Sequence, residues 1–262
     1  MMRTMGFGGR LVEAAGGGLP ESGDRAVNGA GRRPISILVY GLPGSGKSTF
    51  ACGAPGAYVL DLGGCGSRGR GERIVSFDQL QTAYKVLATM GAGAGGEEGV
   101  PGTIVLDSLT DLYHLILDHV VESNFAGLAE PRPEYPCALD WQVAERKLRR
   151  CLAAFQGLGA DLIATCLCDV GWREGGREEA EGGLCEPRFV PLLPRKLSLS
   201  IPSCFDVVCY AYAAPGGGSE GCRYLLRTGG DPAVLARDRS GRLGPVEPQD
   251  ARFVLDRCRE QV

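Results

Sequence analysis

The residues best suited to chemistry form one run at positions 41–48, with the Gly-x-x-x-x-Gly-Lys-Ser spacing of a P-loop. Glycines in such a run leave successive backbone N–H groups free to surround a phosphate at the start of a helix. Lys47 adds a point charge for the β- and γ-phosphates, and Ser48 offers a hydroxyl to Mg²⁺. A chance match is the alternative, but a β-branched run precedes the motif and a helix-capable segment follows it, as its mechanism requires. We therefore assign the binding of a nucleoside triphosphate, most simply ATP, to Gly41, Leu42, Pro43, Gly44, Ser45, Gly46, Lys47, Ser48 and Thr49.

Asp107 ends the apolar run 103–107 and resembles the carboxylate that holds Mg²⁺ in P-loop proteins. A role as helix N-cap is the alternative, because Asp and Ser both cap helices well. Since Ser108 follows directly, the two roles can be divided between the two residues. We predict that Asp107 and Ser48 hold Mg²⁺, and that Ser108 serves as a cap or phosphate sensor.

Two further polar residues end predicted strands on the side where the nucleotide would lie. Asp61 ends the run 57–61 and is a candidate catalytic residue beside Lys47 and Asp107. Carboxylates in such places also make turns, so both interpretations of Asp61 stay open. Thr165 lies at the end of the strand predicted from the run 162–166, one residue before Cys166, and could sense the γ-phosphate, or it could be a buried core threonine.

A pair of arginines, Arg237 and Arg239, follows a short apolar run near the end of the chain. On an extended segment, residues two apart project to the same face. That arrangement suits a charge clamp on a γ-phosphate, which a neighbouring subunit could supply. The alternative is an ordinary solvated basic edge that also includes Arg242.

The elements that must position these residues alternate along the chain. Apolar runs typical of buried strands span residues 35–40, 57–61, 103–107 and 162–166. Segments with helical periodicity span residues 77–87, 109–121 and 141–155. Two later runs, 205–212 and 223–227, predict a β-hairpin, and the polar segments 67–71, 91–99, 171–183 and 214–221 predict loops. This order predicts an α/β fold with a mainly parallel sheet flanked by helices and a C-terminal hairpin.

Composition sets the class of protein. Residues 1–33 are rich in Gly, Ala and Arg and lack periodicity, which predicts a disordered leader before a single domain at 34–262. The net charge of -3 gives no global attraction to nucleic acid or anionic membranes. The sequence has no apolar run of the ~20 residues that span a bilayer. We expect a cytoplasmic protein with no membrane partner.

In this order the motifs resemble those of the phage-type RecA-like P-loop ATPases, a group that includes single-strand annealing proteins of bacteriophage recombination. The matching segments are residues 41–49, 59–61, 105–113, 140–141 and 236–241, so the resemblance covers about residues 34–248. The P-loop is specific only to the superfamily. The run Leu-Asp-Ser-Leu-Thr-Asp-Leu-Tyr at 106–113 and the late Arg-x-Arg narrow the resemblance.

The resemblance implies a RecA-like nucleotide-binding domain at 34–262, with Asp107 as the Walker B carboxylate. It implies that Arg237 and Arg239 act in trans on a nucleotide held between subunits of a homo-oligomer, although a Lys is the more usual first member. It also implies that single-stranded DNA is contacted by the segment after Thr165. The basic residues there are Arg173, Arg177, Arg188, Arg195 and Lys196, and they alternate with Glu174, Glu178, Glu179 and Glu181. The local charge is near balance, which weakens the electrostatic case for DNA.

One departure from the family pattern concerns hydrolysis. RecA-like enzymes usually carry a glutamate two residues after the aspartate that ends the second strand, and here that place is Gly63. Cys166 and Leu167 likewise stand where polar residues are common. Without a positioned base the attacking water is poorly activated, at a cost of ~10²–10⁴ in rate. We expect ATP binding with slow or absent hydrolysis unless Asp61 or a neighbouring subunit substitutes.

Three functions are compatible with these motifs. The leading hypothesis is an ATP-binding recombination protein that assembles on single-stranded DNA and promotes annealing, in a bacterial host cell if the protein is phage-encoded. A single-strand binding protein would be a further partner. The alternative is a nucleotide-gated assembly or regulatory ATPase that binds only protein. A small-molecule kinase ranks last, because the sequence lacks an Arg-rich lid that follows an acceptor-site aspartate.

Overall fold

A computed structural model describes residues 33–64, 66, 69–92, 101–125, 135–172, 187–216 and 221–260. The predicted disordered leader lies outside the described residues except for Arg33. Of the loops predicted at 91–99, 171–183 and 214–221, residues 93–99, 173–183 and 217–220 lie outside them as well, together with Arg173, Arg177 and the four glutamates of that segment. The described ends of these loops were predicted wrongly, because residues 91–92 belong to a helix and residues 171–172 and 214–215 to strands.

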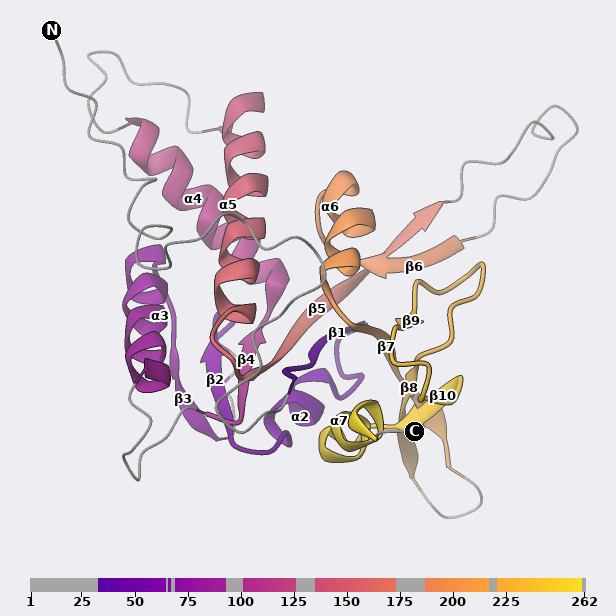
Figure 1. The fold of residues 1–262 in the computed structure, drawn as a ribbon. Helices are drawn as coiled ribbons and strands as arrows, with labels where there is room; N and C mark the ends of the chain where they lie inside the picture. Colours follow the sequence, from indigo (N-terminus) through magenta and orange to yellow (C-terminus); the bar gives the residue numbers. More distant parts are fainter. Residues whose placement is uncertain are drawn as a thin grey trace, which may run out of the picture.

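One mixed, mainly parallel sheet forms the centre of the molecule (Figure 1). Its strands are β1 (Ser36–Gly41), β2 (Ala57–Asp61), β3 (Arg70–Arg73), β4 (Thr103–Asp107), β5 (Asp161–Trp172), β6 (Pro187–Pro191), β7 (Val207–Pro215), β8 (Cys222–Arg227), β9 (Arg237–Asp238) and β10 (Val246–Pro248). The order across the sheet is β10-β8-β7-β1-β5-β4-β2-β3, with β6 paired to β5 and β9 paired to β7. The strands from β7 to β3 in that order run parallel to one another, whereas β6, β8, β9 and β10 pair antiparallel.

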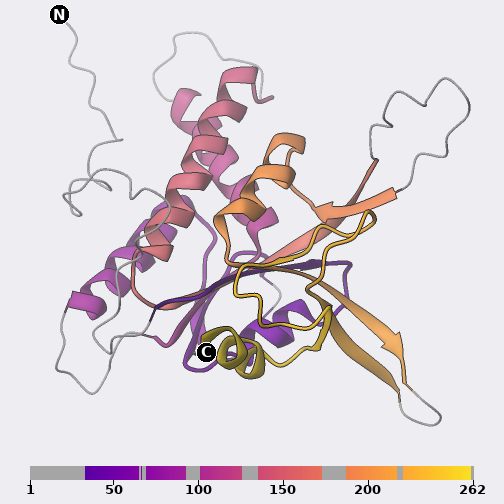
Figure 2. The same cartoon turned by 45° about the vertical axis from the view of Figure 1, so that its right-hand side comes forward.

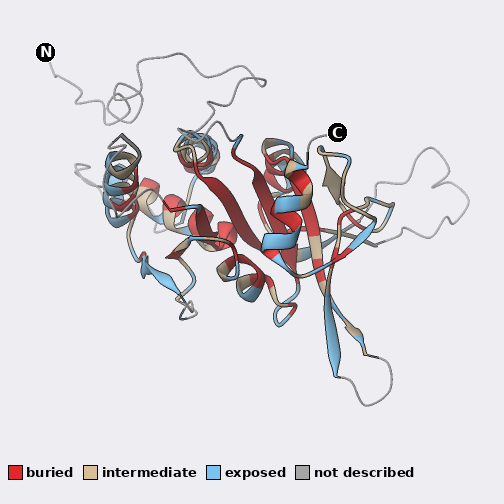
Figure 3. Ribbon diagram, turned by 60° about the horizontal axis from the view of Figure 1, so that its bottom comes forward, coloured by how far each residue is buried: buried red, intermediate tan, exposed pale blue. Residues whose placement is uncertain are grey.

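Helices cover both faces of this sheet (Figure 2). They are α2 (Lys47–Cys52), α3 (Phe77–Ala92), α4 (Leu109–Phe125), α5 (Ala138–Gln156), α6 (Arg195–Ser200), the 3-10 helix η2 (Ile201–Cys204) and α7 (Ala251–Arg259). In β1, Leu38 and Tyr40 face the core shared with α3, α4, α5 and α6. Ile37 and Val39 face the second core, which α2 and α7 share. All four side chains are fully buried, which is why β1 is an uninterrupted apolar run in the sequence. Coloured by burial, the central strands of the sheet are buried along most of their length (Figure 3).

The predicted α/β class with a mostly parallel sheet and helices on both faces is confirmed. Two strand predictions were wrong in extent. Residues 70–73, part of which we expected in a loop, form the edge strand β3, whose residues are all exposed and therefore carry no apolar pattern. At Gly71 a Cβ atom would lie 2.1 Å from the carbonyl oxygen of Val59, so only glycine permits this pairing. The strand expected at 162–166 continues to Trp172, where it pairs with β6.

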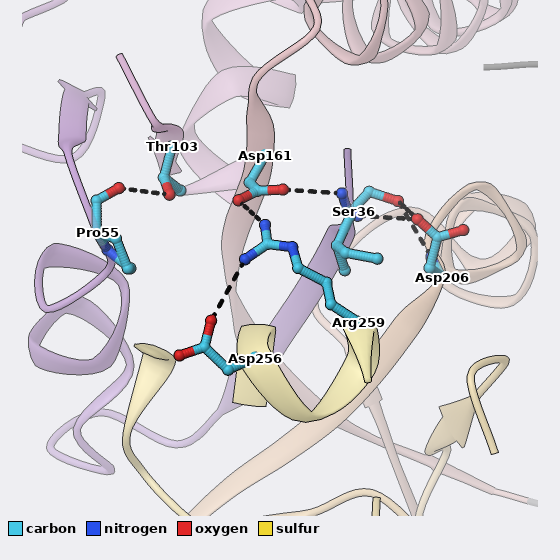
Figure 4. A network of polar contacts seen from close by, with 8 residues as sticks. Ser36, Pro55, Thr103, Asp161, Asp206, Asp256 and Arg259 are labelled. Carbon is cyan, nitrogen blue, oxygen red and sulfur yellow. Dashed lines mark hydrogen bonds and ion pairs between the residues drawn. The ribbon is translucent and has the colours of Figure 1, made fainter. Parts of the chain in front are cut away.

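Polar contacts join the amino-terminal ends of the central strands to the last helix (Figure 4). Asp161, at the start of β5, accepts hydrogen bonds from the N–H of Ile35 at 2.9 Å and from the guanidinium of Arg259 in α7. Asp206 accepts from both the N–H and the hydroxyl of Ser36, each at 2.8 Å. These contacts fix β1, β5, the chain before β7, and α7 together at the edge of the sheet where β1 begins. Among the described helices, none is both long and apolar enough to cross a bilayer.

The Arg259–Asp161 contact predicts a loss of stability on truncation of the arginine. Both side chains are largely buried, with exposed fractions of 14% for Arg259 and 8% for Asp161. Removing one partner of such a pair costs about 3 kcal/mol, because the other charge stays buried. Arg259→Ala should therefore lower the free energy of unfolding by about that amount in a urea titration. Arg252→Ala, at an exposed position of the same helix, should stay within about 0.5 kcal/mol of the parent; equal values for the two variants would contradict the assignment.

Candidate nucleotide-binding site

The glycine-rich loop lies between the end of β1 and the start of α2. Gly44 and Gly46 have φ values of 77° and 87°, in the left-handed region that glycine adopts without strain. Gly46 is the N-cap of α2 and offers no side-chain cap. The N–H groups at the start of α2 are thus left for a ligand, as a phosphate-binding loop requires.

The side chain of Lys47 crosses the inner side of the glycine-rich loop. Its ammonium group donates to the carbonyl oxygens of Gly41 at 2.9 Å and Leu42 at 2.8 Å, and lies 3.5 Å from the hydroxyl of Ser45. The side chain is 9% exposed, so its charge is held close to the loop rather than in solvent. This places a cation where the β- and γ-phosphates of a bound nucleotide would lie.

A pocket of about 450 Å³ opens beside the loop. This volume lies in the range of small-ligand sites. Its lining residues are Gly44, Gly46, Lys47, Ser48, Thr49, Phe50, Tyr224 and Gln249. Sequence reasoning missed the last three. Phe50 lies one residue beyond the predicted segment 41–49, and Tyr224 and Gln249 come from β8 and from the turn before α7 and carry no local motif.

Gln249 connects the loop to the C-terminal strands. Its amide nitrogen donates to the carbonyl of Ser45 at 2.8 Å and to that of Leu225 at 3.0 Å. A Cβ atom at Gly46 would lie 2.3 Å from Oε1 of Gln249 and 2.9 Å from Cδ1 of Tyr224. The glycine therefore serves both the backbone conformation of the loop and the approach of these two side chains.

Asp107 is the last residue of β4. Its carboxylate is buried, and its two oxygens differ in their hydrogen bonding. Oδ1 accepts a hydrogen bond from the hydroxyl of Thr165. Oδ2 is buried and has no hydrogen-bond partner among the described residues. A buried, unpaired carboxylate oxygen is costly, and oxygen is the ligand that Mg²⁺ prefers. Asp107 thus suits the role of a ligand to Mg²⁺. Ser48, which lines the pocket, offers a second oxygen.

A magnesium ion here would be held mainly by the nucleotide. The described part of the chain contains no cluster of three or more His, Cys, Asp or Glu side chains that could cage a metal. Mg²⁺ commonly binds through one or two protein oxygens, with waters and substrate phosphates completing its octahedron. When bound, the ion would neutralise charge on the phosphates that Lys47 also faces.

Asp61 makes a turn in the structure. Its carboxylate accepts from the N–H groups of Gly64 at 2.8 Å and Gly66 at 3.1 Å, and both glycines have positive φ. The chain leaving β2 is also tied to β4, because the N–H of Leu62 donates to the carbonyl of Asp107 at 2.7 Å. The geometry supports the interpretation of Asp61 as a turn residue. The catalytic role of Asp61 stays a prediction.

Residues 33–240 match the AAA domain family of protein sequences. The match covers well over half of the chain and includes the P-loop, Asp61, Asp107 and Thr165. The chain belongs to the AAA domain family of P-loop ATPases. No curated protein matches the sequence. The family match ends before β10 and α7. Gln249, which contacts the P-loop, therefore lies outside the matched residues.

In this AAA domain, the polar residues after Asp107 fasten α4 to the sheet. The Ser108 hydroxyl accepts from the N–H of Asp111 at 3.4 Å and donates to the Asp111 carboxylate, which is the geometry of an N-cap. The Thr110 hydroxyl donates to the carbonyl of Leu192 at 3.1 Å and accepts from the N–H of Leu167 at 3.2 Å. Of the two roles considered for Ser108, the structure supplies the cap.

The placement of Thr165 at a strand end was wrong. Because β5 runs on to Trp172, Thr165 lies inside the strand, fully buried between β1 and β4. Its hydroxyl is directed to Asp107, so it positions the predicted metal ligand. The extension of β5 escaped sequence reasoning because Asp169 and Gly171 interrupt the apolar run beyond Cys168.

Arg237 and Arg239 lie toward the end of the sheet strands opposite to the P-loop of their own chain. Arg237 pairs with Val208, near the start of β7, whereas the P-loop follows the opposite end of the parallel strand β1. Arg237 donates to the carbonyls of Pro202 and Phe205, and Arg239 donates to that of Ser203, all at 2.9 Å. The two arginines therefore lie on one face of the chain, as expected, and their hydrogen bonds hold η2 in place. Their action on the nucleotide of a neighbouring subunit stays a prediction.

The close approach at Gly46 predicts that Gly46→Ala weakens nucleotide binding. The new Cβ atom would displace Gln249 and Tyr224 from the pocket, and we expect MgATP affinity to fall roughly tenfold or more, equivalent to about 1.4 kcal/mol. Isothermal titration calorimetry measures this change. Gly44→Ala is the matched control, since Gly44 lies in the same loop and also has a positive φ (77°), but a Cβ atom there would meet no atom within 4 Å. Equal affinities in the two variants would show that backbone strain alone acts.

Proposed function

We propose that this protein is an ATP-binding, RecA-like member of its family that acts in DNA recombination, where it assembles on single-stranded DNA and promotes annealing. One observation carries the nucleotide part of the proposal. The P-loop with its inward lysine lies at the same sheet edge as Asp107, whose Oδ2 is buried and without a partner among the described residues. The P-loop lysine suits a triphosphate, and the unpaired oxygen of Asp107 suits Mg²⁺.

The arrangement of the strands supports a RecA-like site. β5 lies between β1, which ends in the P-loop, and β4, which ends in Asp107. Lys47, Thr165 and Asp107 are therefore supplied by three neighbouring segments of one sheet. Since Thr165 bonds to Asp107, a shift of β5 would move the metal ligand. A nucleotide bound at this edge can thus act on the segment that continues from β5 toward β6, where the resemblance implies contact with DNA.

Slow hydrolysis follows from the side chains around the site. Gly63 is exposed and has no group that could take a proton from water. Both oxygens of Asp61 accept backbone N–H groups of the turn. Burial raises the pKa of the Cys166 thiol to about 12, so this residue stays neutral and cannot act as a base near neutral pH. ATP in this protein would serve mainly as a switch for assembly.

A head-to-tail oligomer is consistent with the distribution of charge. The P-loop and the Arg237–Arg239 pair occupy opposite ends of the sheet strands within one chain. A heterologous interface, in which one end of each subunit meets the other end of the next, would bring the arginines toward a neighbour's nucleotide. Of the basic residues predicted for DNA contact, Arg195 and Lys196 are exposed at the start of α6.

Binding of single-stranded DNA is the test of this function. Fluorescence anisotropy with an oligo-dT strand, at low and moderate salt and with or without MgATP, should show binding that weakens with salt. Lys47→Ala, which removes the cation from the P-loop, should abolish the dependence on ATP. If the protein binds no DNA in any nucleotide state, the recombination role is wrong and the protein-binding regulatory ATPase becomes the better proposal.

Single-turnover kinetics test the slow-hydrolysis part. Relative to P-loop ATPases with a positioned glutamate, the rate should be lower by about 10²–10⁴. Residual hydrolysis should disappear in Lys47→Ala. Rapid turnover that is lost in Lys47→Ala but retained in Asp61→Asn would contradict the proposal, because an unidentified base would then be at work.

A further inference from the structure

The antiparallel pair β7–β8 has two faces with different chemistry. Alternate residues of a strand point to opposite faces, and directly paired residues share a face. Ala213 pairs with Tyr224, and Tyr224 lines the nucleotide pocket. Tyr212 pairs with Leu225, so Tyr212 and its neighbour in the alternation, Tyr210, lie on the opposite face.

Aromatic rings form a row along this second face. Phe189 of β6 stacks on Tyr210 with ring centroids 5.2 Å apart and planes inclined by 25°. Tyr210 stacks in turn on Tyr212, at 6.1 Å and 11°. Tyr40, fully buried, packs against Tyr210 from the core at 5.4 Å. The row therefore leads from a rigid interior to Tyr212, which is partly exposed and is its outermost ring.

Two arginines share the face with these rings. Arg227 pairs with Tyr210, and Arg223 pairs with Ala214, two residues beyond Tyr212. Arg227 forms an ion pair with Asp231 at 2.9 Å. Arg223 is exposed and forms no ion pair with any residue that the structure describes. A positive charge in excess thus lies next to the outermost ring.

We propose that this face, made of Phe189, Tyr210, Tyr212, Arg223 and Arg227, is a base-stacking surface for single-stranded nucleic acid. The inference rests on the proposed function for the identity of the partner, and it adds a contact site on the β7–β8 pair. Proteins that bind single strands combine aromatic rings, on which bases stack, with cations that follow the phosphates. Here the rings lie nearly parallel and Arg223 stands beside them.

The chemistry of the face favours unpaired bases over other partners. A duplex hides the faces of its bases, so stacking on Tyr212 requires a single strand. The packing of Tyr210 between Phe189 and Tyr40 holds the row in place before binding, which lowers the entropic cost of association. Stacking also tolerates any base, so this contact would give affinity without sequence preference.

The test compares two strands that differ only in their bases. Anisotropy is measured with oligo-dT and with an abasic strand of equal length and charge. Tyr212→Ala should weaken binding of oligo-dT by about 5- to 100-fold and leave the abasic strand unchanged. Tyr212→Trp should retain binding, and Tyr212→Leu, which keeps apolar bulk without a ring, should behave like Tyr212→Ala. Arg223→Gln should weaken both strands and reduce the salt dependence.

Tyr135→Ala is the matched control, because Tyr135 is 83% exposed and lies before α5, away from the β7–β8 pair. Unchanged oligo-dT affinity in both Tyr212→Ala and Tyr212→Leu, with the parent still binding DNA, would overturn the stacking surface and leave the recombination role standing. Failure of the parent protein to bind DNA in any nucleotide state would instead remove that role and this surface with it. A Tyr212 variant that changes only self-association in sedimentation would assign the face to a subunit contact and overturn the proposal.

Discussion

A carboxylate buried at the end of β4, with only one oxygen satisfied, is the constraint around which the site is organised. Asp107 can be buried because the flanking strands supply support: the Thr165 hydroxyl from β5 and, at its carbonyl, the N–H groups that follow β2. The second oxygen lacks such support from the described residues, which costs on the order of 1–3 kcal/mol unless a cation binds there. The fold thus keeps a site ready that suits a cation such as Mg²⁺.

The same constraint distinguishes two aspartates that look alike in the sequence. Asp61 and Asp107 each end a buried strand, and they are paired in register across β2 and β4. Two unsatisfied carboxylates side by side would repel each other and compete for one cation. The glycines after Asp61 prevent this, because their positive φ values let two N–H groups turn back onto its carboxylate. Asp61 therefore closes a turn, and Asp107 is left to meet the ligand.

The sequence predicts those parts of the fold and site whose signal is local. The P-loop is a contiguous motif, and β1 and β4 are buried on both faces, so their apolar runs identify them. Edge strand β3 is wholly exposed and gives no such signal. Gln249 meets Ser45 across 204 positions of sequence, a contact that no local pattern encodes. For Arg237 and Arg239 the spacing predicts a shared face, but only the structure identifies the carbonyls of η2 that this face meets.

The β7–β8 pair connects the two halves of the proposed function through one rigid element. On one face Tyr224 borders the nucleotide pocket, and the carbonyl of Leu225 holds Gln249 against the P-loop. On the other face Tyr212 stacks on Tyr210, which packs on the fully buried Tyr40 of β1, the residue just before the loop. A ligand that shifts this pair on one face must shift it on the other, and such coupling is reciprocal by thermodynamic necessity. If nucleotide and single strand favour the same position of the β7–β8 pair, ATP can control assembly without being hydrolysed.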